Sequence, residues 1–211
     1  MKTRAEQEQK YWDSFAGKYD NFVNKKAFKT YKVLYKFLLA DTMETKHLLE
    51  IATGTGTHSI DLCKQIPNIT ATDLSPEMLK IANKKSRENN ITNINFQIED
   101  SCNLSFPDKS FDTILASNIL HLLYKPDWAL VEMKRVLKNN GKIIIPTYYH
   151  GHNLFTHIIS RFMSLSGFKV RSRWSVKSFK KFLDKNGFVL KKTEKVRDKI
   201  PLVYVVALVK N

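Results

Sequence analysis

Cysteine is scarce in this sequence, whose 211 residues hold only Cys63 and Cys102. Two isolated cysteines provide neither a disulfide framework nor the paired spacing of a zinc site. His150, His152 and His157 lie close together, but neither a cysteine nor a carboxylate accompanies them. We therefore expect no bound metal.

Long hydrophobic runs are also absent. No apolar stretch approaches the ~18 residues that a membrane-spanning helix needs, and the longest one, at 200–209, has the pattern of a strand. Residues 1–10 are polar and lack the apolar centre of a signal peptide. We therefore expect a cytoplasmic location.

Acidic residues are few in the last third of the chain. Residues 151–211 hold 14 basic and 3 acidic residues, whereas residues 1–150 hold 21 and 17, within a total net charge of +15. A basic surface attracts nucleic acid, anionic lipid or an acidic substrate. The same composition also simply keeps a protein soluble, so both interpretations stay open.

Strand and helix patterns alternate through the middle of the chain. The predicted strands are 48–51, 69–72, 94–98, 111–116 and 142–147, and the predicted helices are 57–66, 76–88, 118–123 and 126–138. This alternation indicates βαβ units with right-handed crossovers and a parallel sheet. Ser75 and Pro76 are typical of a helix start, and Asn140-Gly141 favours a helix cap or turn before the next strand.

The two ends of the chain depart from this alternation. Helices are predicted at 5–24, 27–40, 153–165 and 175–186, with a basic aromatic loop at 167–174. Strands at 188–194 and 202–209 leave no room for a crossover helix, so they are expected to run antiparallel. We expect one domain over 1–211, in which 1–45 form a helical cap, 46–147 a cofactor-binding core, and 148–211 a substrate cover with the terminal strand pair.

The stretch 47–60 combines a buried strand, a glycine-spaced turn and a helix start, which together can hold a nucleotide-like cofactor. A Walker phosphate loop is excluded because Gly56 is followed by Thr57 rather than lysine. The dinucleotide spacing nearly fits, with Ser59 at the third position and Asp73 further along. The short chain and its antiparallel end, however, leave no separate substrate domain.

Four ordered segments carry a family resemblance: Trp12-Asp-Ser-Phe-Ala-Gly-Lys-Tyr-Asp20, Glu50-Ile-Ala-Thr-Gly-Thr-Gly56, Thr72-Asp-Leu-Ser75 and Glu99-Asp-Ser101. With the reversed final strands, they resemble class I S-adenosylmethionine-dependent methyltransferases of the small-molecule type, similar to ubiquinone and menaquinone C-methyltransferases. The resemblance extends approximately over residues 11–209. It implies an α/β fold of the Rossmann-like methyltransferase type: a doubly wound, seven-stranded, mostly parallel sheet with an antiparallel last strand and an N-terminal helical cap.

The resemblance also implies S-adenosylmethionine as cofactor and a set of residues that bind it. Asp73 would accept from the ribose hydroxyls, Asp100 from the adenine amino group, and the Ser117 carbonyl from the ammonium group. The other predicted cofactor-binding residues are Tyr19, Glu50, Ala52, Thr53, Gly54, Gly56, Leu74, Met78 and Ser101.

Ala52 replaces the first glycine of the family loop. Its methyl group narrows the space beneath the methionine part of the cofactor and carries a cost if the backbone requires positive φ. We expect cofactor binding to survive this small change.

Methyl transfer from a sulfonium is an in-line displacement in which alignment matters most, so a general base is optional. His121 is the best candidate base, although a structural role for this histidine is an equal alternative. Ser117–His121 lack the Asn/Asp-Pro-Pro-aromatic motif of base amino-methylation, and neither cysteine suits cytosine methylation. A small or amphipathic acceptor, methylated at oxygen, nitrogen or carbon, is therefore predicted.

Aromatic residues in the two covering segments favour an apolar or lipid-like acceptor, and ordinary core positions for the same residues are an equal alternative. Basic residues in the second segment also allow contact with a membrane surface; these are Arg161, Lys169, Arg171 and Arg173. Two alternatives remain. One is an RNA-modifying methyltransferase that uses the basic last third, and the other is a non-catalytic cofactor-binding protein of the same fold.

Overall fold

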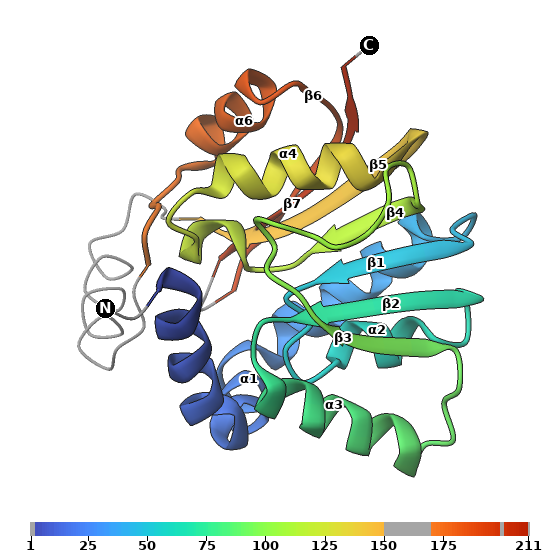
Figure 1. Cartoon of the computed structure of the whole chain (residues 1–211). Helices are drawn as coiled ribbons and strands as arrows, with labels where there is room; N and C mark the ends of the chain where they lie inside the picture. The colour runs from blue at the N-terminus through green and yellow to red at the C-terminus, as the bar shows by residue number, and fades with distance from the viewer. Residues whose placement is uncertain (1–2, 150–169, 199–200, 211) are drawn as a thin grey trace.

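A seven-stranded sheet forms the centre of the computed structural model, which describes residues 3–149, 170–198 and 201–210, apart from the side chains of 22, 24 and 26. The strand order is β3-β2-β1-β4-β5-β7-β6, and only β7 runs antiparallel to both of its neighbours (Figure 1). The strands are β1 (His47–Ile51), β2 (Asn68–Asp73), β3 (Ile94–Ile98), β4 (Phe111–Ala116), β5 (Leu137–Tyr148), β6 (Phe188–Val196) and β7 (Leu202–Val209). The predicted doubly wound sheet is confirmed.

Helices cover both faces of this sheet (Figure 1). They are α1 (Arg4–Asp41), α2 (Thr57–Leu62), α3 (Pro76–Glu88), α4 (Pro126–Val136) and α6 (Val176–Lys185), with a 3-10 turn η1 (Leu120–Leu122). One apolar cluster joins α1 and α2 to the sheet, and the other joins α4 and α6 to the opposite face. The molecule therefore has three layers.

The buried strands supply apolar side chains to both layers, as parallel strands covered on two sides must. Leu48 and Leu115 pack into the cluster of α1 and α2, whereas Leu49 and Ile114 pack into the cluster of α4 and α6. This two-sided burial explains why the strands read as nearly continuous apolar runs rather than as alternating ones.

Helix starts agree with the capping residues of the sequence. The Ser75 hydroxyl accepts from the Met78 N–H, with Pro76 in the first turn of α3. At the other end of the chain, Ser175 forms a capping box with Ser178 before α6. The predicted bounds 76–88, 94–98 and 111–116 are confirmed.

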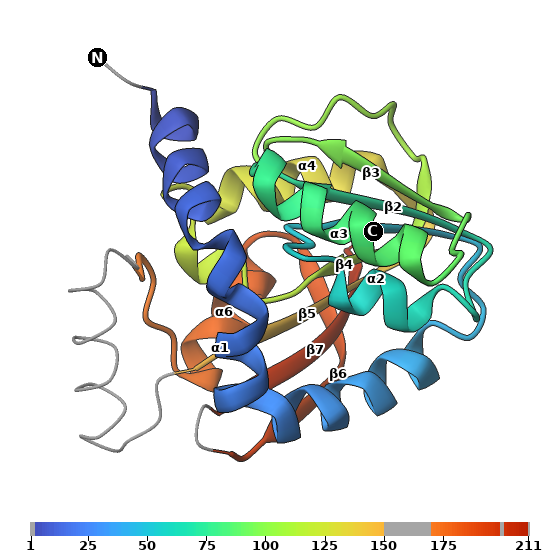
Figure 2. The ribbon, with the colours of Figure 1, turned by 90° about the horizontal axis from the view of Figure 1, so that it is seen from below.

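The N-terminal region is one helix, so the predicted pair of helices at 5–24 and 27–40 is wrong. Buried Ala16, Val23, Ala27 and Leu34 continue one apolar stripe through the expected junction, and this packing outweighs the local cost of Gly17. Figure 2 shows α1 curving around the molecule, with its first half at the carboxyl ends of the strands. Within the described ranges, no helix is both long and apolar enough to cross a membrane.

Asn140-Gly141 was predicted as a cap or turn, but it lies inside β5. The register between β4 and β5 shifts at this point, where Phe111 pairs with Leu137 and Thr113 with Lys142. Gly141 is required because a Cβ there would lie 2.9 Å from the backbone oxygen of Asp112. The glycine thus marks a bulge rather than a chain reversal.

Several predicted bounds change in smaller ways. Helix α2 ends at Leu62, α4 ends at Val136, and the helix predicted at 118–123 is the three-residue turn η1. The helix predicted at 153–165 lies outside the described residues, as do residues 167–169 of the predicted loop, whereas 170–174 contain neither helix nor strand, as predicted.

Two glycines should respond oppositely to alanine. Gly17→Ala should raise the free energy of unfolding by about 0.5–1 kcal/mol, because alanine is the better helix former and a Cβ at this site meets nothing within 4 Å. Gly141→Ala should lower it by about 1–3 kcal/mol, because its Cβ would lie 2.6 Å from Leu137 Cδ1. Urea unfolding of both variants checks this pair, and a shift of both in the same direction would contradict it.

Candidate functional site

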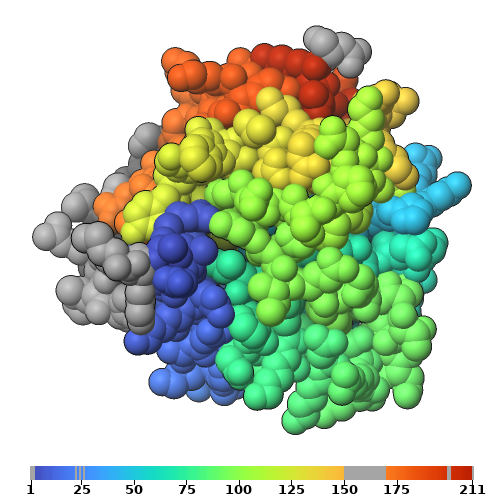
Figure 3. Space-filling view, viewed as in Figure 1, coloured from blue at the N-terminus to red at the C-terminus, as the bar shows by residue number. Residues whose placement is uncertain are grey.

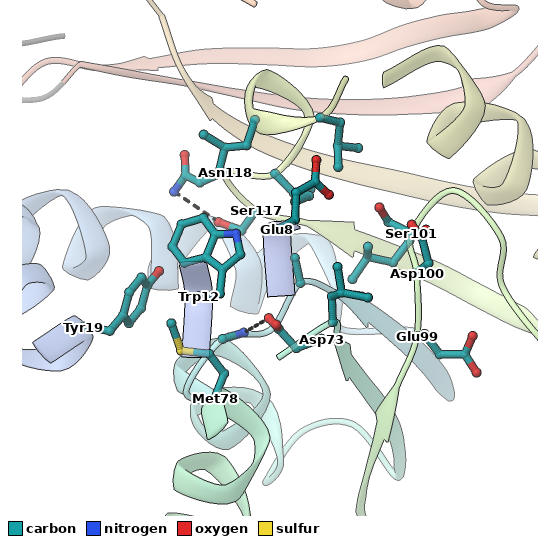
Figure 4. Close-up of a pocket in the computed structure, with 17 residues that line it drawn as sticks. Glu8, Trp12, Tyr19, Asp73, Met78, Glu99, Asp100, Ser101, Ser117 and Asn118 are labelled. Atoms are coloured by element: carbon teal, nitrogen blue, oxygen red, sulfur yellow. Dashed lines mark hydrogen bonds between the residues drawn. The ribbon is translucent and has the colours of Figure 1, made fainter. Parts of the chain in front are cut away.

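A pocket lies at the carboxyl ends of β1, β2 and β4, where ligands bind in open α/β sheets. Its lining residues are Glu8, Trp12, Tyr19, Ile51, Ala52, Gly54, Asp73, Leu74, Met78, Glu99, Asp100, Ser101, Ser117, Asn118, Ile119, Leu122 and Leu123 (Figure 4). Helix α1 supplies one wall, and in Figure 3 its first half lies directly beside the segment after β3. Most of the residues predicted to bind the cofactor are thus brought together.

The loop after β1 has three residues in the left-handed region: Ala52 with φ 55°, Gly54 with φ 57° and Gly56 with φ 79°. Ala52 therefore pays the conformational cost that its sequence position suggested, about 1–2 kcal/mol for a non-glycine residue. Gly54 and Ala52 both line the pocket.

Gly56 allows the start of α2 to approach α3, because a Cβ there would lie 2.9 Å from the Cβ of Ala82. It is not among the residues that line the pocket. Its predicted contact with the cofactor stays a prediction.

Asp73 holds this loop from the end of β2. Its Oδ2 accepts from the Gly54 N–H at 2.8 Å, and its Oδ1 accepts from the Ser75 N–H at 2.9 Å. Burial raises the pKa of Asp73 to about 6, although the backbone donors oppose that shift. The Leu74 N–H also donates to this carboxylate. A carboxylate has about four acceptor positions, and Asp73 lines the pocket, so the same side chain can also accept from a ligand.

Glu50 stabilises the loop from below. Its Oε2 accepts from the hydroxyls of Thr53, at 2.7 Å, and Ser59. Glu50 and Thr53 are buried and do not line the pocket. Burial raises the pKa of Glu50 to about 7 despite both hydroxyl donors. Both residues therefore support the loop from outside the pocket surface.

Asp100 is tied to the N-terminal helix. Arg4 on α1 forms an ion pair with Asp100 Oδ2, and the Cys102 N–H donates to Oδ1 at 2.9 Å. The carboxylate predicted to receive an adenine amino group thus also anchors the first turn of α1. Ser101 lines the pocket beside it.

Tyr19 and Ser117 both line the pocket. A Cβ at Gly54 would lie 3.6 Å from Tyr19 Cε1, so the tyrosine ring packs over the loop. Ser117 Oγ lies 3.3 Å from His58 Nε2, and the His58 ring stacks on Tyr31 at 5.1 Å. Burial lowers the pKa of His58 to about 4, so this histidine is neutral at physiological pH.

His121 is buried behind the pocket rather than among its lining residues. Its Nδ1 lies 3.1 Å from Thr147 Oγ1, and its ring meets Tyr148 edge-on. This position fits a structural histidine, and the proposed role as a base stays a prediction. Of the other histidines considered, His150, His152 and His157 lie outside the described residues.

Several pocket residues escaped sequence reasoning, chiefly Glu8, Asn118, Leu122 and Leu123. A signal for Glu8 was present, because it precedes Trp12 by four residues and so shares its helix face. Asn118 follows β4 closely and has a φ of 56°. No pattern in the sequence predicted this backbone conformation.

Comparison with known proteins identifies the core. Residues 49–145 match the methyltransferase domain family. The demethylmenaquinone methyltransferase of Porphyromonas gingivalis is 35% identical over 133 residues, which cover 56% of this chain and 54% of that protein. That of Paenarthrobacter aurescens is 31% identical over 169 residues, which cover 76% of this chain and 64% of that protein.

The fold is equally recognisable among solved structures. A SAM-dependent methyltransferase from Aquifex aeolicus superposes with a TM-score of 0.66 at 19% identity, covering 83% of this chain and 89% of that one. These comparisons confirm the predicted similarity to methyltransferases and the Rossmann-like fold. The chain nevertheless spans only 54% and 64% of the length of the two curated relatives.

The raised pKa of Glu50 predicts a measurable pH dependence of stability. The folded protein binds this proton more tightly than the unfolded chain, so the stability contributed is complete below about pH 4.5 and lost as pH rises through about 7. Glu50→Gln does not titrate at this position. Relative to this variant, the free energy of unfolding of the wild type should rise by about 3 kcal/mol as the pH is lowered from above 7 to below 4.5.

Urea unfolding at a series of pH values checks this difference. Asp73, shifted in the same direction, and His58, shifted in the opposite one, titrate in both proteins and largely cancel in the comparison. A difference that stays constant with pH would contradict the assignment.

Proposed function

From the methyltransferase domain of residues 49–145, we propose that this chain transfers a methyl group from S-adenosylmethionine to a carbon of a quinone-type ring. The single observation that supports this acceptor most directly is similarity to demethylmenaquinone methyltransferases along 76% of the chain. The apolar part of the pocket, with Trp12, Ile119, Leu122 and Leu123, has the chemistry to receive such a ring.

The residues present fit the cofactor. Ala52 and Gly54 of the loop line the pocket together with Asp73, whose carboxylate has the chemistry to accept from ribose hydroxyls. Leu74 and Met78 offer an apolar surface to the adenine, with Asp100 and Ser101 beside it. When bound, S-adenosylmethionine supplies an electrophilic methyl group.

The protein's own contribution to the reaction is alignment and exclusion of water. Helix α1 closes one side of the pocket through Trp12 and Tyr19, and the loop after β4 closes the other through Ser117 and Ile119. We propose that the acceptor carbon is held between these two walls, facing the methyl group.

The direct test combines calorimetry and product analysis. The protein should bind S-adenosylmethionine, and it should methylate a short-chain demethylmenaquinone reduced with dithionite, as detected by mass spectrometry. Binding without turnover would favour the non-catalytic alternative. Methylation of RNA but not of the quinone would favour the RNA-modifying alternative.

Asp73→Asn should weaken S-adenosylmethionine binding at least tenfold, because the amide NH2 cannot accept from one ribose hydroxyl and the remaining oxygen no longer carries the charge that strengthens the other hydrogen bond. Asparagine has nearly the same shape, so thermal unfolding should confirm a folded variant. Asp127→Asn, on the exposed side of α4, serves as the matched control with unchanged affinity. Equal affinity of wild type and Asp73→Asn in calorimetry would show that the cofactor site is misplaced.

A further inference from the structure

Within the described chain, two buried side-chain oxygens have no hydrogen-bond partner: Glu8 Oε1 and Asn118 Oδ1. Both residues line the pocket, one from α1 and the other from the loop after β4 (Figure 4). Buried acceptors without a donor are costly and uncommon in folded proteins. Their joint occurrence in one pocket therefore points to a ligand that supplies the donors.

Glu8 shares its cationic partner, Arg4, with Asp100. Its other oxygen, Oε2, lies 3.7 Å from Arg4 Nη1, but the same guanidinium is committed to Asp100 through Nη2. The charged groups that act on Glu8 are Arg4, Asp100 and Arg171, and burial raises its pKa above the ordinary range. The side chain is only 18% exposed, so solvent gives it little compensation.

Asn118 is fixed from behind. Its backbone N–H donates to the Pro146 oxygen at 2.8 Å, and its Nδ2 lies 3.5 Å from Ser117 Oγ. Its φ of 56° is one that asparagine tolerates better than most residues. The Asn118 side chain also forms a hydrogen bond with Tyr31. The amide nitrogen is thus engaged by protein groups, whereas the buried Oδ1 has no partner among the described residues.

The cofactor does not need these two oxygens. Under the proposed function its ribose hydroxyls, adenine amino group and ammonium group are received by Asp73, Asp100 and Ser117. The apolar side chains of Ile119, Leu122 and Leu123 line the same pocket as the two free acceptors. A ligand that satisfies both features is an apolar ring bearing a hydroxyl group.

We propose that Glu8 is a specificity-determining residue that, together with Asn118, accepts a hydrogen bond from a ring hydroxyl of the methyl acceptor. This inference rests on the proposed function, because it assumes that the second substrate occupies the apolar part of the pocket. It adds a recognition element outside the matched methyltransferase domain, on α1.

The test measures binding by anaerobic calorimetry with S-adenosylhomocysteine present at saturation. The probes are naphthohydroquinone, which has two hydroxyl donors, and its dimethyl ether, which has none. Glu8→Leu should weaken naphthohydroquinone binding at least tenfold, the effect expected of a hydrogen bond to a charged group, and should leave the ether unchanged. Glu8→Gln retains one acceptor oxygen, so its affinity for naphthohydroquinone should lie between those of the wild type and Glu8→Leu.

Glu6→Gln is the matched control. It removes the same charge from an exposed site of the same helix and preserves the capping box, which glutamine also completes. It should bind both probes like the wild type. All variants should bind S-adenosylhomocysteine within about twofold of the wild type, since the cofactor is received elsewhere.

The outcomes separate this inference from the function on which it rests. If Glu8→Leu keeps the wild-type affinity for naphthohydroquinone, or loses affinity for S-adenosylhomocysteine instead, the role of Glu8 is refuted while the methyltransferase assignment stands. If the wild type binds S-adenosylhomocysteine but neither ring, the ring acceptor and the role of Glu8 fail together. If it binds no S-adenosylhomocysteine, the proposed function itself fails.

Discussion

The hydrogen bond from the Gly54 N–H to Asp73 Oδ2 determines where the site lies. It joins the loop after β1 to the end of β2, and the second oxygen of Asp73 fixes the start of α3 through Ser75. Glu50 supports the same loop from the opposite side through Thr53 and Ser59. Two buried carboxylates thus hold a loop with left-handed backbone conformations. Their burial disfavours the charged form and raises the pKa of both groups.

Helix α1 depends on this loop in turn. Asp13 accepts a hydrogen bond from the Ser75 hydroxyl at 2.5 Å. Asp20 accepts one from the Thr55 hydroxyl at 2.6 Å and forms an ion pair with Lys85. With the Arg4–Asp100 pair, these contacts attach the helix to the segments that follow β1, β2 and β3. The wall of the pocket is therefore positioned by polar contacts with these three segments and not by the apolar core alone.

Sequence reasoning predicted the sheet and most of the residues that the structure gathers around one pocket, because both leave local signals. Strands are predicted by short apolar runs, and the start of α3 is predicted by Ser75-Pro76 directly after the acid Asp73. It failed where tertiary contacts decide the outcome. The continuity of α1 follows from a buried stripe, the place of Gly141 follows from the neighbouring strand, and the partial engagement of Glu8 follows from the competition for Arg4.

The pocket wall and the loop belong to separate stretches of the chain: Glu8 and Trp12 precede residue 49, where the matched domain begins. Under the proposed function, a substitution at position 8 or 12 would change which acceptor the pocket binds without altering the turn that Asp73 holds. A lineage could then exchange one acceptor for another by single substitutions in α1 while keeping the same methyl donor. The acceptor would accordingly be free to diverge faster than the methyl-transfer reaction.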